Sequence, residues 1–279
     1  MKVVKKVRAP VRIDFAGGTT DVSPFKDKYG GCVVNAAINR YVIGELVASN
    51  KKVSLKYVGD VPTSSGLGTS GVMSLVWAAL ISQEKDKKTL AENVYKIEQG
   101  MGQVGGKQDQ YAGAFGGINF IKFNKNRVSL ERLDLSKKFI NELETNLVLV
   151  YTEKPHLATS SNKAMIDNLK SGKNTKNLIR IKNIAIKMKR ALKKEDMYQF
   201  SELLNEETRE RMLLHRSIAP PGIRKIIKEG MNSGASAAKI CGSGGGGSIL
   251  FFGNKKKLKR KFGRRVIDFK FDFEGLKRF

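Results

Sequence analysis

The chain is poor in the residues that build disulfide frameworks and zinc centres. Its 279 residues include only two cysteines, Cys32 and Cys241, and only two histidines, His156 and His215. Cysteines so far apart fit a reducing compartment and argue against a disulfide framework or a thiolate metal site. With two histidines, a zinc cluster is not expected either.

Long apolar runs are also missing. The longest, Val72 to Ile81 and Ile249 to Phe252, are interrupted or too short to cross a bilayer. The amino terminus carries basic residues but lacks the apolar stretch and small-residue cleavage site of a secretory signal. We therefore expect a cytoplasmic protein without a membrane partner.

Acidic residues are scarce relative to basic ones. The chain has 52 Lys and Arg against 26 Asp and Glu, which gives a formal net charge of +26. Such a charge raises a nucleic-acid-binding hypothesis, because basic faces attract phosphate backbones. Much of it lies in residues 170–194 and 255–278, and the first segment lacks the interleaved aromatics of a base-stacking platform. We favour a lysine-rich solvated surface over a dedicated nucleic-acid patch.

Strand signals dominate the first 58 residues, and helical signals follow. After Pro62, apolar residues recur at helical spacing on one face of a helix that begins near Thr69. A second helix is predicted to open with a capping box formed by Thr89 and Glu92. Its predicted inward residues are Leu90, Val94 and Ile97.

The remaining segments complete an α+β pattern. Strands are predicted at residues 118–123, 147–151, 237–241 and 248–252, and the chain is mostly helical between about 158 and 235. Strands, then helices, then strands again, without a repeat or a long linker, predict an α+β fold. We predict two closely joined domains, residues 1–150 and residues 151–279.

The segment Pro62 to Gly71 places glycines and hydroxyl residues directly before an amphipathic helix. Free amides at a helix amino terminus cradle phosphate, and glycine lets the backbone approach a ligand closely. No lysine follows the glycines, so this is not a Walker A loop. An ordinary Ser-rich turn that caps a helix explains the composition equally well.

Two carboxylates follow this segment. Glu98 ends a predicted helix, and Asp109 sits in the small-residue segment Gly105 to Gly117. Near a phosphate loop, one carboxylate can hold a metal ion while the other accepts a hydroxyl proton. Taken alone, Glu98 is more often a solvated helix residue and Asp109 a helix-start cap.

The run Gly242 to Gly247 contains a literal G-x-G-x-x-G pattern. A dinucleotide fingerprint passes from a strand into a helix, whereas Ser248 to Phe252 reads as another strand, so we reject a Rossmann assignment. Five glycines in six positions indicate that the backbone approaches a ligand or another loop closely.

Together these segments resemble the GHMP kinases, the superfamily of galactokinase, homoserine kinase, mevalonate kinase and phosphomevalonate kinase. The three family motifs stand in order as Ala9 to Asp21, Pro62 to Gly71 and Lys239 to Gly247. The stretches Ala16 to Asp21, Tyr29 to Gly31 and Gly106 to Tyr111 look most like heptose-phosphate kinases and fucokinase-type sugar kinases. The resemblance implies a ribosomal-protein-like N-terminal half that binds ATP and a ferredoxin-like C-terminal half.

The resemblance also implies site residues. Asp109 becomes the catalytic base, with Arg12 stabilising charge beside it. Mg²⁺ would be held by Glu98 and by a hydroxyl of Thr69 or Ser70. The ATP-binding residues implied are Pro62, Ser64, Ser65, Gly66, Leu67, Gly68, Thr69 and Ser70. The substrate-binding residues implied are Gly17, Gly18, Thr19, Asp21, Gly242, Ser243, Gly244 and Gly245.

This sequence departs from the family pattern in two places. Asp14 stands where related sugar kinases carry a smaller or neutral polar residue, which adds negative charge near the acceptor. Residues 152–156 stand where those kinases show a Thr-Gly turn and an arginine. Lys154, His156 and Lys163 are the candidates to replace that arginine. The chain is also shorter than most sugar kinases of this group.

The expected activity is therefore that of an ATP-dependent kinase. It would transfer the γ-phosphoryl group of Mg-ATP to a hydroxyl of a sugar or sugar phosphate, with the anomeric hydroxyl as one candidate. A mevalonate-type or other non-sugar member of the superfamily is the alternative among enzymes. A non-catalytic nucleic-acid-binding or regulatory homologue is the alternative of another class.

Overall fold

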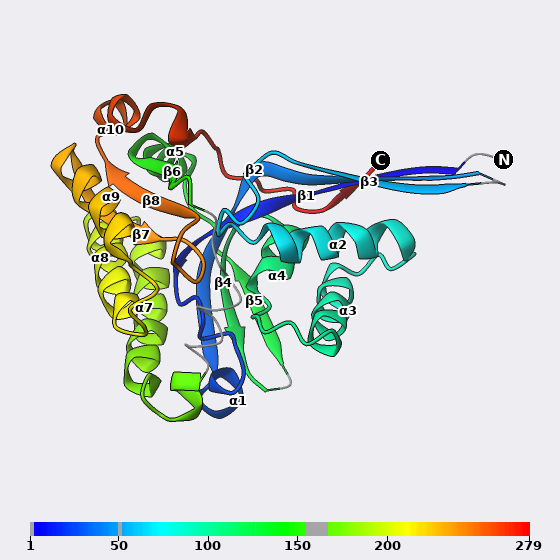
Figure 1. Ribbon diagram of the computed structural model, residues 1–279, viewed down its shortest axis with the longest axis horizontal. Coiled ribbons are helices and arrows are strands. Elements are labelled where there is room, and N and C mark those ends of the chain that lie inside the picture. The colour runs from blue at the N-terminus through cyan, green and yellow to red at the C-terminus, as the bar shows by residue number, and fades with distance from the viewer. Residues whose placement is uncertain (1–2, 50–51, 126, 155–166) are drawn as a thin grey trace.

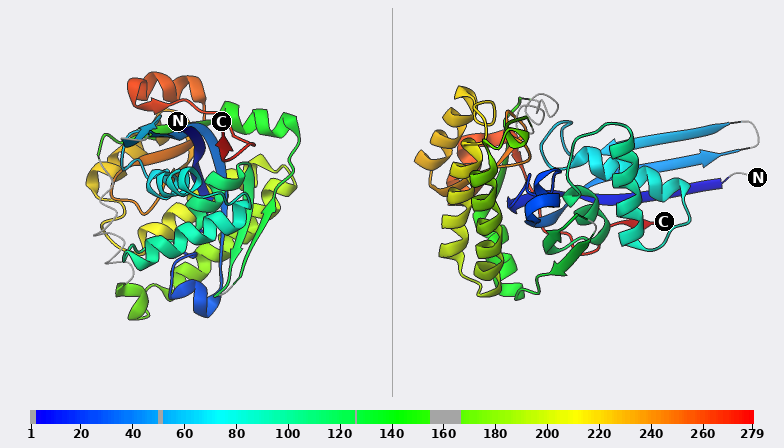
Figure 2. Two further views of the ribbon diagram at one scale, coloured as in Figure 1. Left: turned by 90° about the vertical axis from the view of Figure 1, so that its right-hand side faces the viewer. Right: turned by 90° about the horizontal axis from the view of Figure 1, so that it is seen from below.

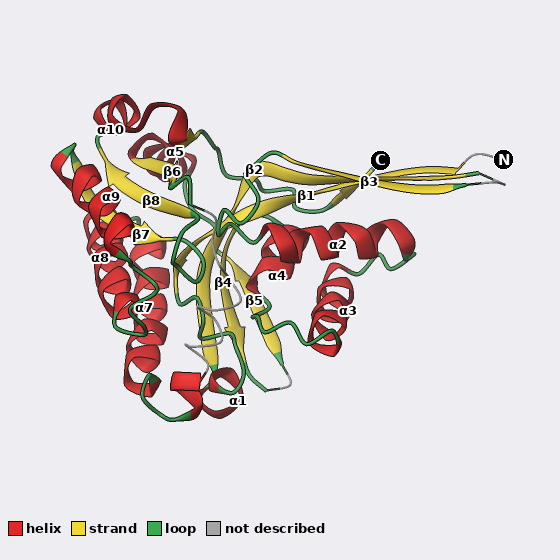
Figure 3. Cartoon of the chain, viewed as in Figure 1, coloured by secondary structure: helices red, strands yellow, loops and turns green. Residues whose placement is uncertain are grey.

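The computed structural model describes residues 3–49, 52–125, 127–154 and 167–279. It is built from two antiparallel sheets and the helices that cover them, so the α+β prediction is confirmed. Figure 3 shows helices packed around the inner strands, while the outer parts of β1, β2 and β3 extend beyond them. No helix in the described ranges is long and apolar enough to span a bilayer.

The first sheet runs in the order β10-β1-β2-β4-β5, and β3 pairs with the far part of β2. Its strands are β1 (Val3–Ala16), β2 (Gly31–Ala48), β3 (Val53–Gly59), β4 (Ile118–Phe123), β5 (Val128–Arg132) and β10 (Lys277–Arg278). The outer parts of β1, β2 and β3 form an arm that projects from the body (Figures 1 and 2).

The inner half of β1 carries the residues that matter for the site. From Ala9 to Ala16 every residue is buried, because helices lie on both faces of this part of the sheet. The helices on one face are α2 (Thr69–Ile81) and α4 (Gln108–Phe115), and α3 (Lys87–Gly100) packs against both of them. The pair on the other face is α7 (Thr175–Lys193) and α8 (Met197–Met212). A polar side chain on inner β1 is therefore held without bulk water.

The second sheet has the order β7-β8-β6-β9. Its strands are β6 (Leu147–Tyr151), β7 (Ala235–Ile240), β8 (Ser248–Gly253) and β9 (Val266–Ile267). Helix α8 contacts both β1 and β7, so it joins the two sheets. The other helices are α1 (Phe25–Tyr29), α5 (Lys137–Asn146), α9 (Pro221–Asn232) and α10 (Lys255–Phe262), with the short 3-10 turn η1 (Gly263–Arg265).

Several predicted elements are confirmed. Strands occupy residues 118–123 and 147–151, and α2 begins at Thr69. The two-domain division at residue 150 stays a prediction. Strand β6 opens the second sheet at Leu147, while the end of the chain returns to the first sheet, where Phe271 bridges Ile38 and β10 pairs with β1.

Two details predicted for helix α3 are wrong. The helix begins at Lys87, where Asp86 caps it by accepting hydrogen bonds from the Thr89 amide (2.8 Å) and hydroxyl (2.7 Å). Glu92 instead accepts bonds from Lys107 Nζ and the Tyr111 hydroxyl, both 2.6 Å. Ile97 is 46% exposed and its neighbour Glu98 is buried. The face of α3 that carries Leu90, Val94 and Glu98 is the one that packs against the protein.

Candidate active site

The start of helix α2 has the geometry of an anion site. Gly68 takes the N-cap position in the left-handed conformation (φ 78°), and no side chain among the described residues caps the helix. A Cβ at Gly68 would lie 2.8 Å from Cγ of Asp109, so only glycine lets the loop pass this close to that carboxylate. The free amides of the first turn carry the positive end of the helix dipole. This turn lies at the wall of a cavity.

That cavity has a volume of about 320 Å³ and gathers residues from both halves of the chain. Most of the predicted site residues line it: Arg12, Gly18, Thr19, Asp21, Ser64, Ser65, Gly66, Gly68, Thr69, Ser70, Glu98, Asp109, Gly242 and Ser243. The expected neighbourhood of the α2 start and Asp109 is therefore present. Their individual roles remain predictions.

Five predicted residues do not line the cavity: Gly17, Pro62, Leu67, Gly244 and Gly245. Leu67 belongs to the hydrophobic core, with no exposed surface. Gly17 lies against the backbone of Cys32, and Gly244 lies against Ile218. These two glycines let their loops pack against neighbouring backbone and do not face the cavity. A sequence motif alone does not distinguish such glycines from those that line the cavity wall.

Arg12 joins the phosphate loop to Asp109. Its Nε donates to Asp109 Oδ1 (2.7 Å), and its Nη1 donates to the carbonyl of Gly66 (2.7 Å). Burial alone would lower the pKa of Arg12, but the charges of Asp109 and Asp14 outweigh it and raise that pKa. Arg12 therefore stays a cation that fixes one oxygen of Asp109 against the loop.

Glu98 is the carboxylate that α3 turns inward. Its Oε2 accepts a 2.5 Å hydrogen bond from Gln110 Nε2, while its Oε1 is buried and has no hydrogen-bond partner among the described residues. Burial, together with the charge of Asp109, raises the pKa of Glu98. The Ser74 hydroxyl near this carboxylate partly offsets this rise in pKa. A carboxylate oxygen that accepts no hydrogen bond at bonding distance, in a negative setting, is suited to a hard cation.

Asp21 lies in the wall of the same cavity. It accepts a bond from the Gln108 amide (3.2 Å), and Gly106 packs so closely that a Cβ there would overlap the carboxylate. Burial, and then the charge of Asp109, raise the pKa of Asp21 to about 6. This carboxylate therefore changes its charge near neutral pH.

We predict an acidic limb in the pH profile of the acceptor reaction. Below pH 6 Asp21 gains a proton, loses its charge and keeps fewer sites that accept hydrogen bonds from the substrate, so kcat/KM for the acceptor should fall by up to roughly tenfold per pH unit. Asp21→Asn should remove this limb and lower the plateau. A limb that persists unchanged in Asp21→Asn would assign it to another group.

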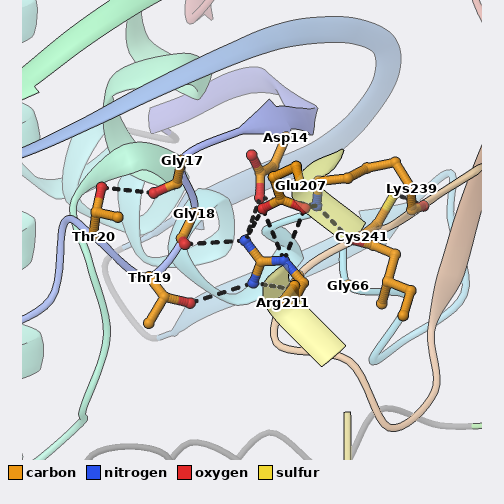
Figure 4. A network of polar contacts seen from close by, with 12 residues as sticks. Asp14, Gly17, Gly18, Thr19, Thr20, Gly66, Glu207, Arg211, Lys239 and Cys241 are labelled. Atoms are coloured by element: carbon orange, nitrogen blue, oxygen red, sulfur yellow. Dashed lines mark hydrogen bonds and ion pairs between the residues drawn. The ribbon is translucent and has the colours of Figure 1, made fainter. Parts of the chain in front are cut away.

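The largest feature that the sequence did not reveal is a buried charge cluster (Figure 4). It consists of Asp14 on β1, Glu207 and Arg211 on α8, and Lys239 on β7, and each side chain is at most 1% exposed. Arg211 donates to Glu207, and Lys239 Nζ lies 3.1 Å from Glu207 Oε2. Two cations face two anions, so the cluster balances its charge away from water.

Arg211 also joins two loops in the cavity wall, the loop of Gly18 and Thr19 and the loop of Gly242. Its guanidinium donates to the carbonyls of Gly18 (3.0 Å) and Gly242 (3.2 Å) and to the hydroxyl of Thr19 (3.3 Å). Every nitrogen of this guanidinium therefore has a partner inside the protein. The one sequence signal was the Glu207 and Arg211 spacing of four on a helix, which is usually a surface pair.

The cavity is acidic although the chain is strongly basic. Its described walls carry four carboxylates, from Asp14, Asp21, Glu98 and Asp109. The two arginines in those walls are Arg12 and Arg211, and both are already paired with carboxylates. A polyphosphate would therefore need a divalent cation to enter with it.

Of the three residues expected to replace the family arginine, Lys154 alone lies within the described residues. Lys154 accepts a backbone hydrogen bond from Gly247 through its carbonyl (2.8 Å), and it does not line the cavity. His156 and Lys163 lie outside the described residues. The described structure thus gives Lys154 a structural role in holding the glycine loop.

Two family models match the chain. The model for the GHMP kinases N terminal domain matches residues 32–117, and the model for the GHMP kinases C terminal matches residues 188–270. Together they cover more than half of the chain. The phosphate loop lies in the first match and Arg211 in the second.

Individual relatives agree with these models. D-glycero-α-D-manno-heptose 7-phosphate kinase from Campylobacter jejuni is 29% identical over 336 residues and covers 99% of both chains. A bifunctional fucokinase/GDP-fucose pyrophosphorylase from Arabidopsis thaliana is 23% identical and covers 94% of this chain and 31% of its own. The crystal structure of a D-glycero-D-manno-heptose 1-phosphate kinase from Bacteroides thetaiotaomicron has a TM-score of 0.78 at 24% identity, with 99% of both chains covered. The chain belongs to the GHMP kinases, as the ordered motifs predicted.

Proposed function

We propose that this kinase transfers the γ-phosphoryl group of Mg-ATP to a hydroxyl of a sugar phosphate. The observation that carries the proposal is one cavity that holds the uncapped start of α2, Arg12 and Asp109. The amides of α2 suit the nucleotide phosphates, and the carboxylate suits a hydroxyl proton.

The site residues have separate roles in the phosphoryl transfer. Asp109 accepts the proton of the acceptor hydroxyl through its Oδ2, since Oδ1 is held by Arg12. The acceptor oxygen forms a bond to the γ-phosphorus as the bond to the ADP oxygen breaks. Arg12 and the α2 amides stabilise the negative charge that develops on the γ-phosphoryl oxygens. These residues therefore act mainly by positioning the two reactants and stabilising charge.

The proposal includes Mg²⁺, and the donors present fit it. Glu98 Oε1 is a buried oxygen without a partner in the described structure, and the hydroxyls of Thr69 and Ser70 lie in the walls of the same cavity. Magnesium prefers few protein oxygens together with phosphate oxygens and water, so a single carboxylate and a hydroxyl suffice. When bound, the ion would neutralise the phosphates in this acidic cavity.

The acceptor side suits a molecule rich in hydroxyl donors. Apart from Glu98, oxygens of Asp14, Gln108 and Gln110 are buried without a partner among the described residues, and all three residues line the cavity. Hydroxyl groups satisfy such acceptors. The Campylobacter jejuni relative is named for a heptose 7-phosphate, which makes that sugar phosphate the first acceptor to test.

A coupled ADP-release assay tests the proposal. The purified chain with Mg-ATP should respond to D-glycero-α-D-manno-heptose 7-phosphate in a panel of hexoses, heptoses, their phosphates, polyols and mevalonate. Omitting the acceptor gives the background rate. A chain that binds Mg-ATP by calorimetry yet phosphorylates nothing in the panel would defeat the proposed function, and a response to mevalonate alone would replace the acceptor class.

A further inference from the structure

The four residues of the buried charge cluster, Asp14, Glu207, Arg211 and Lys239, differ in the hydrogen bonds that they make. Arg211 and Lys239 place their donors on Glu207 and on backbone carbonyls at hydrogen-bond distance, including 2.6 Å from Lys239 Nζ to the Ile240 carbonyl. Asp14 receives only distant cations, with Oδ2 at 3.6 Å from both Arg211 Nη2 and Lys239 Nζ. Asp14 therefore balances charge in the cluster without using its hydrogen-bonding capacity there.

The other oxygen of Asp14 is left without any partner. Oδ1 is buried and accepts no hydrogen bond among the described residues, although the side chain is ionised by the cations around it. An ionised oxygen in this state is strongly unfavourable unless a donor reaches it. Glu207, which is equally buried, has both oxygens occupied. The missing donor is thus specific to Asp14.

The position of Asp14 shows where such a donor would come from. Among the four cluster residues, only Asp14 and Arg211 line the cavity, and the donors of Arg211 are committed. Strand β1 places Asp14 two residues after Arg12, which binds Asp109. Gly18 lies against Oδ2 of Asp14, since a Cβ there would overlap that oxygen. The unpartnered oxygen Oδ1 therefore belongs to a residue that lines the cavity wall beside Gly18.

We propose that Asp14 Oδ1 accepts a hydrogen bond from one hydroxyl of the acceptor sugar and thereby determines which acceptors are used. This inference rests on the proposed function and refines it. An acceptor with a hydroxyl at that position is selected, and one with a phosphate or carboxylate there is rejected by the charge of Asp14. The phosphate of a sugar phosphate must then lie at the other end of the acceptor.

Three variants separate this contact from the charge balance of the cluster. Asp14→Asn removes the charge and leaves an excess of buried positive charge, so it also lowers stability. Lys239→Met removes one cation of the cluster, and Lys239 does not line the cavity. The double variant Asp14→Asn with Lys239→Met restores charge balance, so it should recover the melting temperature that Asp14→Asn loses.

The decisive readout is the KM for heptose 7-phosphate and for its analogues that lack one hydroxyl each. Relative to Lys239→Met, the double variant should raise the acceptor KM roughly 10- to 100-fold, the range for a hydrogen bond to a charged group. The KM for ATP should stay unchanged. With one of the analogues, the two variants should differ by less than about threefold, because the hydroxyl that Asp14 binds is already missing.

Two results would overturn the inference while leaving the proposed function intact. The first is a double variant whose acceptor KM equals that of Lys239→Met, since Asp14 would then act only through charge. The second is an equal rise in KM for the parent sugar and every analogue. If the unmodified chain phosphorylates no sugar at all, the proposed function itself fails and this inference fails with it.

Discussion

Replacing Asp109 by asparagine is expected to reduce kcat by roughly 10²- to 10⁴-fold, the range that a general base contributes. Asparagine keeps the size of the side chain and still offers an oxygen to Arg12, so the phosphate loop should keep its shape. The affinity for Mg-ATP should change little, because the α2 amides do not depend on the proton acceptor. Single-turnover assays and calorimetry measure the two quantities.

The matched control is Asp27→Asn. Asp27 is a carboxylate on α1 that pairs with Lys26 and does not line the cavity, so its loss should leave kcat unchanged. Turnover in Asp109→Asn comparable to that of the control would remove Asp109 from the base role. Arg12 and the α2 amides would then have to account for the catalysis alone.

Local sequence signals predicted the start of helix α2 in the cavity wall. The glycines and hydroxyl residues before Thr69 favour a helix start with free amides, and the structure has one there. This works because a helix start depends on neighbours within a few residues. The strand after Gly247 likewise follows from local composition, and it confirms the rejection of a Rossmann unit.

Tertiary packing determines which residues of α3 face inward, and local sequence signals did not predict this correctly. Glu98 and Ile97 are adjacent on α3, and which of them faces inward depends on where α2 and α4 lie. A hydrophobic pattern assigns the inward position to Ile97, although the burial of Glu98 is stabilised by the amide of Gln110. A carboxylate that lines the cavity is therefore buried where the apolar periodicity would place isoleucine.

The charge cluster could not be predicted from the sequence for a related reason. Asp14 is separated from Arg211 by most of the chain, and α8 brings them together only when both sheets have formed. The departure of Asp14 from the family pattern was visible as an added negative charge. What it faces could come only from the packed structure.

Arg211→Met is expected to lower the free energy of unfolding by about 3–5 kcal/mol, the range for breaking a buried ion pair. Methionine fills much of the volume but leaves Glu207 and Asp14 opposite Lys239 alone, so a buried negative charge goes unbalanced. Denaturant unfolding measures the loss. Arg209→Met, on an exposed residue two positions earlier in α8, should change stability by less than about 0.5 kcal/mol.

A double variant separates stability from catalysis at Arg211. Replacing Glu207 by leucine together with Arg211→Met leaves Asp14 paired with Lys239, so the buried charge is balanced and stability should largely return. The carbonyls of Gly18 and Gly242 would still lack their common donor, because no other described side chain is bonded to both. The acceptor KM should therefore stay high while the nucleotide affinity is normal. Recovery of both quantities would show that Arg211 contributes only to folding and does not hold the acceptor loops in place.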